Sequence, residues 1–92
     1  MKADFSHVKV QLTFEGEPTD FDIRKELGNN IRQNTADIGL DEVARQIYFS
    51  EGEIEIPDEY VLPIIDIASK CFIVPLQQAL RQLLIHENHE KN

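Results

Sequence analysis

The chain has a single cysteine, Cys71, so its 92 residues cannot form an internal disulfide. Secreted domains of this size usually depend on disulfides, because so short a chain buries little apolar surface. Their absence predicts a reducing compartment. Cys71 stands beside Phe72 and Ile73 in an apolar stretch. This setting predicts a buried structural thiol, since a nucleophilic cysteine needs an electropositive and partly open site.

Long apolar runs are also lacking. A membrane-spanning helix needs about 18 or more consecutive apolar residues, and no segment of the chain approaches this length. The first seven residues contain one lysine, but the apolar stretch of a signal peptide does not follow them. We therefore expect a cytoplasmic protein with no membrane partner.

Positive charge is scarce. Only 9 Lys and Arg residues stand against 17 Asp and Glu residues, which leaves a formal net charge of −8. Affinity for nucleic acid comes from Lys and Arg that replace the counterions around phosphates, and attraction to anionic lipid needs the same charges. The composition therefore argues against nucleic acid and anionic membranes as partners.

The chain does contain enough apolar side chains for one folded domain. Hydrophobic residues make up 41% of it, which is a normal fraction for a globular protein. Domains usually span about 50–250 residues, so there is no room for a second one. We predict a single domain over residues 1–92, with an ordered core over about 6–86 and a frayed polar tail over 87–92.

Two segments alternate apolar and polar residues and therefore predict β-strands. The alternation in 8–14 places Val8, Val10, Leu12 and Phe14 on one face. The shorter segment, 53–56, carries Glu53 and Glu55 on its outer face. We expect these two glutamates to pair with Lys9 of the first strand across a sheet.

Four further segments show the apolar spacing of helices. The first is expected over about 20–33, with Thr19 or Asp20 as its cap, and the second from about Leu40. The last two follow Pro57 and Pro75. The predicted fold class is α+β, one small domain with two short strands and four helices in the order β-α-α-β-α-α.

Gly28 and Pro63 each leave two local structures open. A glycine inside a helix costs about 1 kcal/mol relative to alanine, so Gly28 indicates either close packing against a neighbour or a locally loose helix. Pro63 lacks the N–H that a helix interior requires. Either the turn that opens at Asp58 is separate, or the third helix begins near Tyr60 to Leu62.

The first strand is one candidate interaction surface. A two-stranded sheet leaves edges with which another chain can pair. Because the second strand carries glutamates, the first strand is the better edge for a partner, through Val8, Val10, Leu12 and Phe14. Two hypotheses stay open: a homodimer joined through this strand, and a monomer whose hairpin is covered by helices.

A run of side-chain amides is the other candidate surface. Residues 29–34 hold four of them, including Asn29, Asn30 and Gln33. Amides both donate and accept hydrogen bonds, so an exposed amide face can recognise a peptide backbone. Asparagine is also common where helices end, which is the structural alternative.

Two polar clusters bear on metal chemistry. Residues 51–59 hold five acidic side chains, but not in the order of a calcium loop. His86 and His89 have helical spacing, but they lack the pattern of a zinc protease. The structural alternatives are a solvated acidic face and a polar tail.

The pattern in residues 27–48 is specific enough to compare with known proteins. It combines the helix Leu27-Gly28-Asn29-Asn30-Ile31, the turn Asp37-Ile38 and the helix Val43-Ala44-Arg45-Gln46-Ile47-Tyr48. With the acidic strand that follows, it resembles small uncharacterised proteins carried by bacterial phages and prophages, over about residues 20–60. The resemblance implies a bacterial cytoplasm and a role in assembly or regulation through protein contacts. It assigns no functional residue.

No phosphate-binding loop, nucleophile elbow, Cys-x-x-Cys pair or Ser/His/Asp arrangement is present in the sequence. We therefore expect no catalytic residue and no cofactor. The predicted function is a non-enzymatic protein-interaction module whose partner is another protein or a second copy. The alternative is a divalent-metal-binding protein or small metal-dependent enzyme that uses 51–59 or His86 and His89. A third hypothesis is an acidic decoy of a DNA-binding protein.

Overall fold

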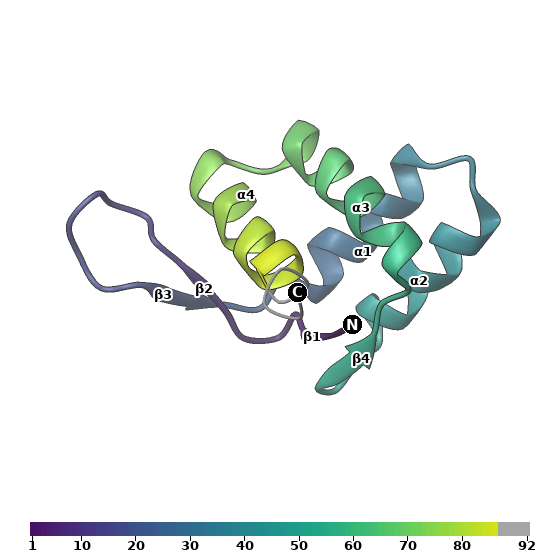
Figure 1. The fold of residues 1–92 in the computed structure, drawn as a ribbon, viewed down its shortest axis with the longest axis horizontal. Coiled ribbons are helices and arrows are strands. Elements are labelled where there is room, and N and C mark those ends of the chain that lie inside the picture. Colours follow the sequence, from purple (N-terminus) through teal and green to yellow (C-terminus); the bar gives the residue numbers. More distant parts are fainter. Residues whose placement is uncertain (87–92) are drawn as a thin grey trace.

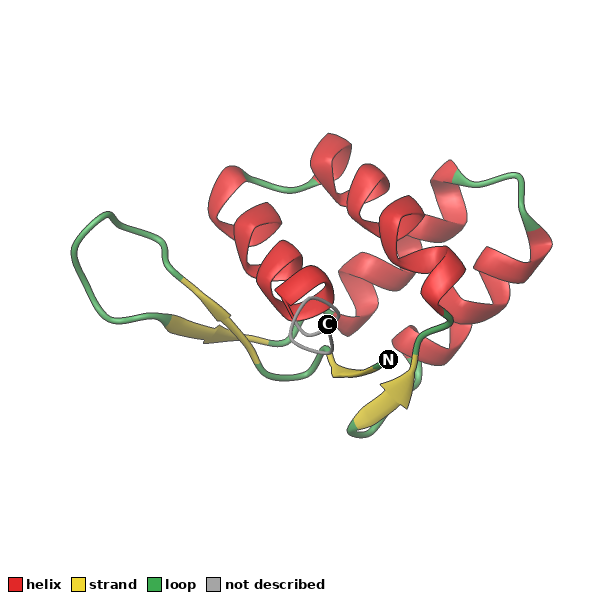
Figure 2. Cartoon of the chain, viewed as in Figure 1, coloured by secondary structure: helices red, strands yellow, loops and turns green. Residues whose placement is uncertain are grey.

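Four helices and four three-residue strands make up most of residues 1–86, the part of the chain that the computed structural model describes (Figures 1 and 2). The elements in chain order are β1 (Lys2–Asp4), β2 (Val8–Val10), β3 (Thr19–Phe21), α1 (Arg24–Asn34), α2 (Ile38–Tyr48), β4 (Glu53–Glu55), α3 (Asp58–Cys71) and α4 (Val74–Arg81), followed by a π-helical turn, Gln82–His86. The α+β class and its four helices are confirmed. The predicted tail, 87–92, lies outside the described residues.

The strands form two separate antiparallel pairs. β1 pairs with β4, and Lys2 lies opposite Glu55. β2 pairs with β3, and Lys9 lies opposite Asp20. The expected pairing of Glu53 and Glu55 with Lys9 was therefore wrong. β1 and β3 were not predicted, because alternation over three residues cannot be distinguished from a loop.

The first strand is shorter than its alternation suggested. It ends at Val10, and residues 11–18 form a loop that reaches away from the helices (Figure 1). The side-chain amide of Gln11 donates to the carbonyl oxygens of Thr13 and Gly16. These bonds form within the loop, and Leu12 and Phe14 are exposed there.

Helix α1 begins four residues later than predicted, because Thr19–Phe21 pairs with β2 in place of forming a helical turn. Asp22 holds the junction between β3 and α1. Its carboxylate accepts hydrogen bonds from the backbone N–H and the guanidinium of Arg24, and these bonds lower the pKa of Asp22 to about 2. Arg24 also donates to the carbonyl oxygen of Ser50, which ties this junction to the end of α2.

Helices α1 and α2 pack closely at Gly28. A Cβ at this position would lie 2.9 Å from the carbonyl oxygen of Ala44 and 3.0 Å from the Cβ of Tyr48. Of the two alternatives for Gly28, close packing is confirmed. Helix α2 begins at Ile38 because Asp37 caps it, accepting hydrogen bonds from the backbone N–H groups of Gly39 and Leu40.

Helix α3 runs without a break from Asp58 to Cys71 and contains Pro63 at its sixth position. Both alternatives for Pro63 were therefore wrong. The proline leaves the carbonyl of Glu59 without its usual helical donor. Glu59 is exposed, and the apolar face that follows Pro63 is buried. Burial of that face outweighs the loss of one hydrogen bond.

The core lies where α1, α3, α4 and the N-terminal segment meet. Its apolar residues come from every helix, and α4 packs against β2. Phe5, between β1 and β2, is completely buried, and its backbone carbonyl accepts a hydrogen bond from the N–H of Ile23. The N-terminal segment, which the sequence analysis left without structure before residue 6, is therefore part of the core.

The β2–β3 hairpin carries an exposed ion pair that titrates. Nδ1 of His7 lies 3.0 Å from Oδ2 of Asp20. This hydrogen bond raises the pKa of His7 above its usual 6.5 and lowers that of Asp20 below its usual 3.8. The contribution of His7 to stability is fully present below pH 6.5 and is lost as the pH rises through its raised pKa. That of Asp20 is present above pH 3.8 and is lost as the pH falls through its lowered pKa.

We therefore predict that a His7→Gln substitution destabilises the protein most between pH 3.8 and 6.5. The effect is small, because both side chains are exposed to solvent. Thermal unfolding of both proteins at a series of pH values measures the difference, which should shrink as the pH rises through the raised pKa of His7. A difference that grows with alkaline pH would contradict the prediction.

Candidate interaction surfaces

An apolar groove lies between the β2–β3 hairpin and the turn that joins α3 to α4. Its volume is about 340 Å³. We call it the hairpin groove and define it by its lining residues, Val10, Leu12, Phe21, Ile23, Glu26, Cys71, Phe72, Ile73 and Leu76. Glu26 is the only charged side chain among them. An open apolar groove of this kind is typical of a site that receives another apolar surface.

The exposed walls of the hairpin groove come from two turns in the chain. Leu12 and Phe21 project from the hairpin, and Ile73 from the α3–α4 turn. Ile73 is the N-cap of α4 and has extended backbone angles, because the chain must leave the α3 direction before Pro75 allows a new helix. This change of direction carries Ile73 and its neighbour Val74 out of the core.

The sequence-predicted residues of the first strand separate into buried and exposed pairs. Val8 and Val10 are buried, so Val8 presents no surface to a partner and Val10 lines the groove. Leu12 lies on a groove wall, and Phe14 stands fully exposed in the 11–18 loop. The predicted apolar strand face is thus divided between the core and a loop. Phe21, Ile73 and Val74 are further exposed apolar residues.

Cys71 is exposed and lines the hairpin groove, so the prediction of a buried thiol was wrong. It is the last residue of α3, where the helix ends and the apolar face no longer determines burial. Its Sγ lies 3.7 Å from Nδ2 of Asn34. The pattern of neighbouring apolar residues misled the prediction, because Phe72 and Ile73 themselves lie at the turn.

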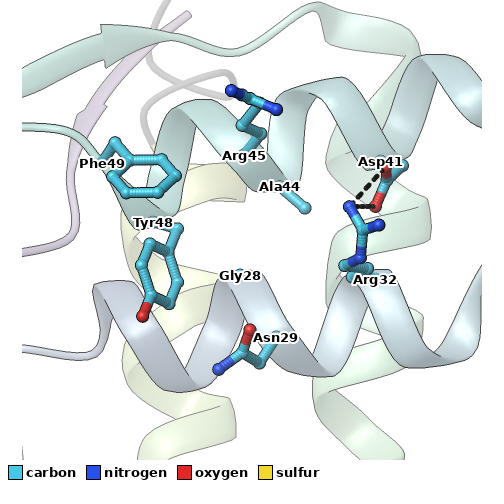
Figure 3. A pocket seen from close by; sticks show the side chains of 8 residues that line it. All are labelled: Gly28, Asn29, Arg32, Asp41, Ala44, Arg45, Tyr48 and Phe49. Atoms are coloured by element: carbon cyan, nitrogen blue, oxygen red, sulfur yellow. Dashed lines mark hydrogen bonds and ion pairs between the residues drawn. The ribbon is translucent and has the colours of Figure 1, made fainter.

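A second hollow lies between α1 and α2 and is lined by both charged and apolar side chains (Figure 3). Its volume is about 230 Å³, and its lining residues are Gly28, Asn29, Arg32, Asp41, Ala44, Arg45, Tyr48 and Phe49. We call it the α1–α2 hollow. Figure 3 shows Gly28 and Ala44 between the aromatic rings on one side and Arg32 on the other. The helices touch at these two small residues, and the larger side chains surround the hollow beside this contact.

Charge in the α1–α2 hollow is arranged across the two helices. Nη1 of Arg32, on α1, lies 3.1 Å from Oδ2 of Asp41, on α2. The guanidinium of Arg45 lies 6.0 Å from the ring centre of Phe49, and Nζ of Lys25 lies 5.9 Å from that of Tyr48. Cations at this distance from an aromatic face are attracted to it. The hollow therefore gathers positive charge in a strongly acidic chain.

The predicted amide face is not one surface. Asn29 lines the α1–α2 hollow and Gln33 is exposed, whereas Asn30 is half-buried. The side chain of Asn34 donates to the backbone carbonyl of Asn30, which is the local bonding expected at a helix end. Of Asn29, Asn30 and Gln33, only Asn29 lines the α1–α2 hollow.

The acidic segment 51–59 does not converge on one point. Within residues 1–86, no three His, Cys, Asp or Glu side chains lie close enough together to hold one metal ion. The side chains of Glu53 and Glu55 project from β4 and are exposed. The other proposed ligand pair, His86 and His89, lies outside the described side chains: His89 is not among the described residues, and only the backbone of His86 is described.

The chain thus folds into a small α+β domain that carries an apolar groove and a hollow lined by two arginines. None of the helices in residues 1–86 has the length and apolar character to cross a membrane. Comparison of the chain with protein-family models, curated proteins and solved structures gives no significant match.

Proposed function

We propose that this protein is a non-enzymatic interaction module that binds an apolar segment of another protein in the hairpin groove. The supporting observation is the groove itself, whose walls expose Leu12, Phe21 and Ile73 to solvent. Removing apolar surface from water contributes about 25 cal/mol per Å². Burying these apolar side chains under a partner therefore stabilises the complex.

The charges around the groove favour a partner with basic residues beside its apolar ones. Glu26 lines the groove, and Glu15 and Glu17 lie in the adjoining loop. A second copy would bring another net charge of −8 to the interface, which opposes association at moderate ionic strength. We therefore propose a different protein as the occupant, in preference to a homodimer. The process is assembly or regulation in a bacterial phage or prophage, as the sequence resemblance implies.

A substitution on the groove wall tests this proposal. The probe is an amphipathic peptide of leucine and lysine, and its counterpart carries glutamate in place of lysine. We expect the lysine peptide to bind and Ile73→Asp to weaken its binding about tenfold or more, because a carboxylate on the wall must be desolvated. Fluorescence anisotropy of the labelled peptides gives both affinities.

Leu62→Asp is the matched control. Leu62 is 67% exposed on α3 and Ile73 is 62% exposed, so both substitutions add one negative charge at a similarly exposed apolar residue. Leu62 does not line the groove. If the two variants bound the lysine peptide equally well, the hairpin groove would not be the binding site. Sedimentation tests the homodimer: a dimer lost only in Ile73→Asp would make a second copy the occupant.

A further inference from the structure

We propose that the α1–α2 hollow binds a carboxylate of an acidic peptide segment. The hairpin groove and the hollow share no lining residue, so the inference is independent of the proposed function. It rests on the charge, the free donors and the shape of the hollow.

Positive charge is concentrated at the α1–α2 hollow. Three of the nine Lys and Arg residues stand at the hollow, because Arg32 and Arg45 line it and Lys25 lies over the ring of Tyr48. Asp41 is the only acidic lining residue. A chain with a net charge of −8 thus has a local excess of positive charge here. Such an excess attracts an anion.

The two arginines of the hollow have hydrogen-bond donors that are not used within the described part of the chain. Among the described residues, Arg45 makes no ion pair, and its guanidinium lies over the Phe49 ring. Both contacts between Arg32 and Asp41 use Nη1 of the arginine. A guanidinium has five N–H donors in one plane, so both arginines keep donors for a ligand. Carboxylates match this geometry with two parallel hydrogen bonds.

The aromatic side of the hollow favours a ligand that carries an apolar group beside its carboxylate. Gly28 and Ala44 let the two helices touch and carry too little side chain to fill the hollow, and the rings of Tyr48 and Phe49 form one side at a centroid separation of 4.7 Å. An exposed carboxylate alone gains little from such a site, since ion pairs at a surface contribute about 0–1 kcal/mol. A peptide can place an apolar side chain against the rings together with the carboxylate. We therefore assign the site to an acidic peptide.

The test is an NMR titration of the ¹⁵N-labelled protein with a capped Glu-Phe-Glu peptide. We expect saturable shifts of the Gly28, Ala44 and Arg45 backbone amides, and none from the neutral Gln-Phe-Gln peptide of the same size. Sodium acetate and inorganic phosphate are separate arms. If acetate or phosphate shifted the same amides and bound as tightly as the peptide, the assignment to a peptide would be overturned.

Two substitutions separate a specific site from general electrostatics. Arg45→Gln should weaken binding of the acidic peptide about tenfold, which is the effect of losing one charge-assisted hydrogen-bond donor. Arg81→Gln removes the same charge from an exposed arginine of α4 that does not line the hollow, and it should leave the affinity unchanged. Both arginines are exposed, and unchanged thermal unfolding verifies the fold. Equal weakening by the two variants, or no shift from the peptide, would overturn the proposal.

Discussion

Replacing Phe5 with alanine should lower the free energy of unfolding by about 3–5 kcal/mol. The ring is completely buried in the core, and the chain around it connects β1 to β2. Removing it leaves a cavity that the neighbouring core side chains cannot fill without moving. Urea denaturation of the two proteins measures the difference. A small domain has about 5–15 kcal/mol of total stability, so this variant should be close to unfolding at 37 °C.

Phe14→Ala is the matched control, because it makes the same chemical change at the opposite degree of burial. Phe14 is 106% exposed and Phe5 is 0% exposed. Substitutions on the surface usually change stability by less than about 0.5 kcal/mol, and we expect this outcome for Phe14→Ala. If both variants lost stability equally, Phe14 would be packed against the body of the protein, contrary to its exposure here.

Gly28→Val should cost about 2–3 kcal/mol, because an added side chain at this position overpacks the contact between α1 and α2. The neighbour closest to the new Cβ is the carbonyl oxygen of Ala44, and a backbone atom cannot rotate away as a side chain can. The helices must move apart or α1 must bend. Thermal unfolding gives the loss of stability, and an NMR spectrum shows whether the change is centred on the two helices.

The control for this change is Gly52→Val in the turn before β4. A Cβ at Gly52 meets no other heavy atom within 4 Å, and none of the glycines has a positive φ. The same substitution there should cost less than about 1 kcal/mol. Full stability of Gly28→Val would mean that the two helices do not touch at this position.

The helices could be predicted because each carries its own evidence. In α2, the residues Leu40, Val43, Ala44 and Ile47 recur at helical spacing, and all four are buried. Periodicity of this kind depends only on neighbouring residues in the sequence. The sequence also offered close packing as one of two explanations for Gly28, but it could not choose between them, because the partner surface belongs to another helix.

The strands were harder to predict because pairing, and not periodicity, determines where they end. Alternation continues from Val8 to Phe14, yet only Val8–Val10 has a partner strand. β1 and β3 have three residues each, and the acidic residues near β3 are equally suitable for the first turn of a helix. The choice between strand and helix at Thr19–Phe21 was made by its contact with β2.

The candidate surfaces show the same division. Leu12 and Asn29 were named from the sequence, and each lines one of the two surfaces. Phe21, Ile73, Arg32 and Arg45 were not predicted to belong to an interaction surface. No sequence spacing connects Phe21 to Ile73, which line the same groove because the hairpin and the α3–α4 turn both border it. Arg32 and Arg45 face one hollow because α1 and α2 pack as a pair.

The scarcity of cysteine, basic residues and long apolar runs determined by itself that the chain depends on its core and carries a strong negative charge. Local patterns determined the four helices. Tertiary structure alone decided which apolar side chains stay exposed, because burial depends on what packs against a residue and not on its neighbours in sequence. It also decided where the few positive charges converge. Long-range contacts therefore placed Cys71 at the surface, Phe5 in the core and two arginines around one hollow.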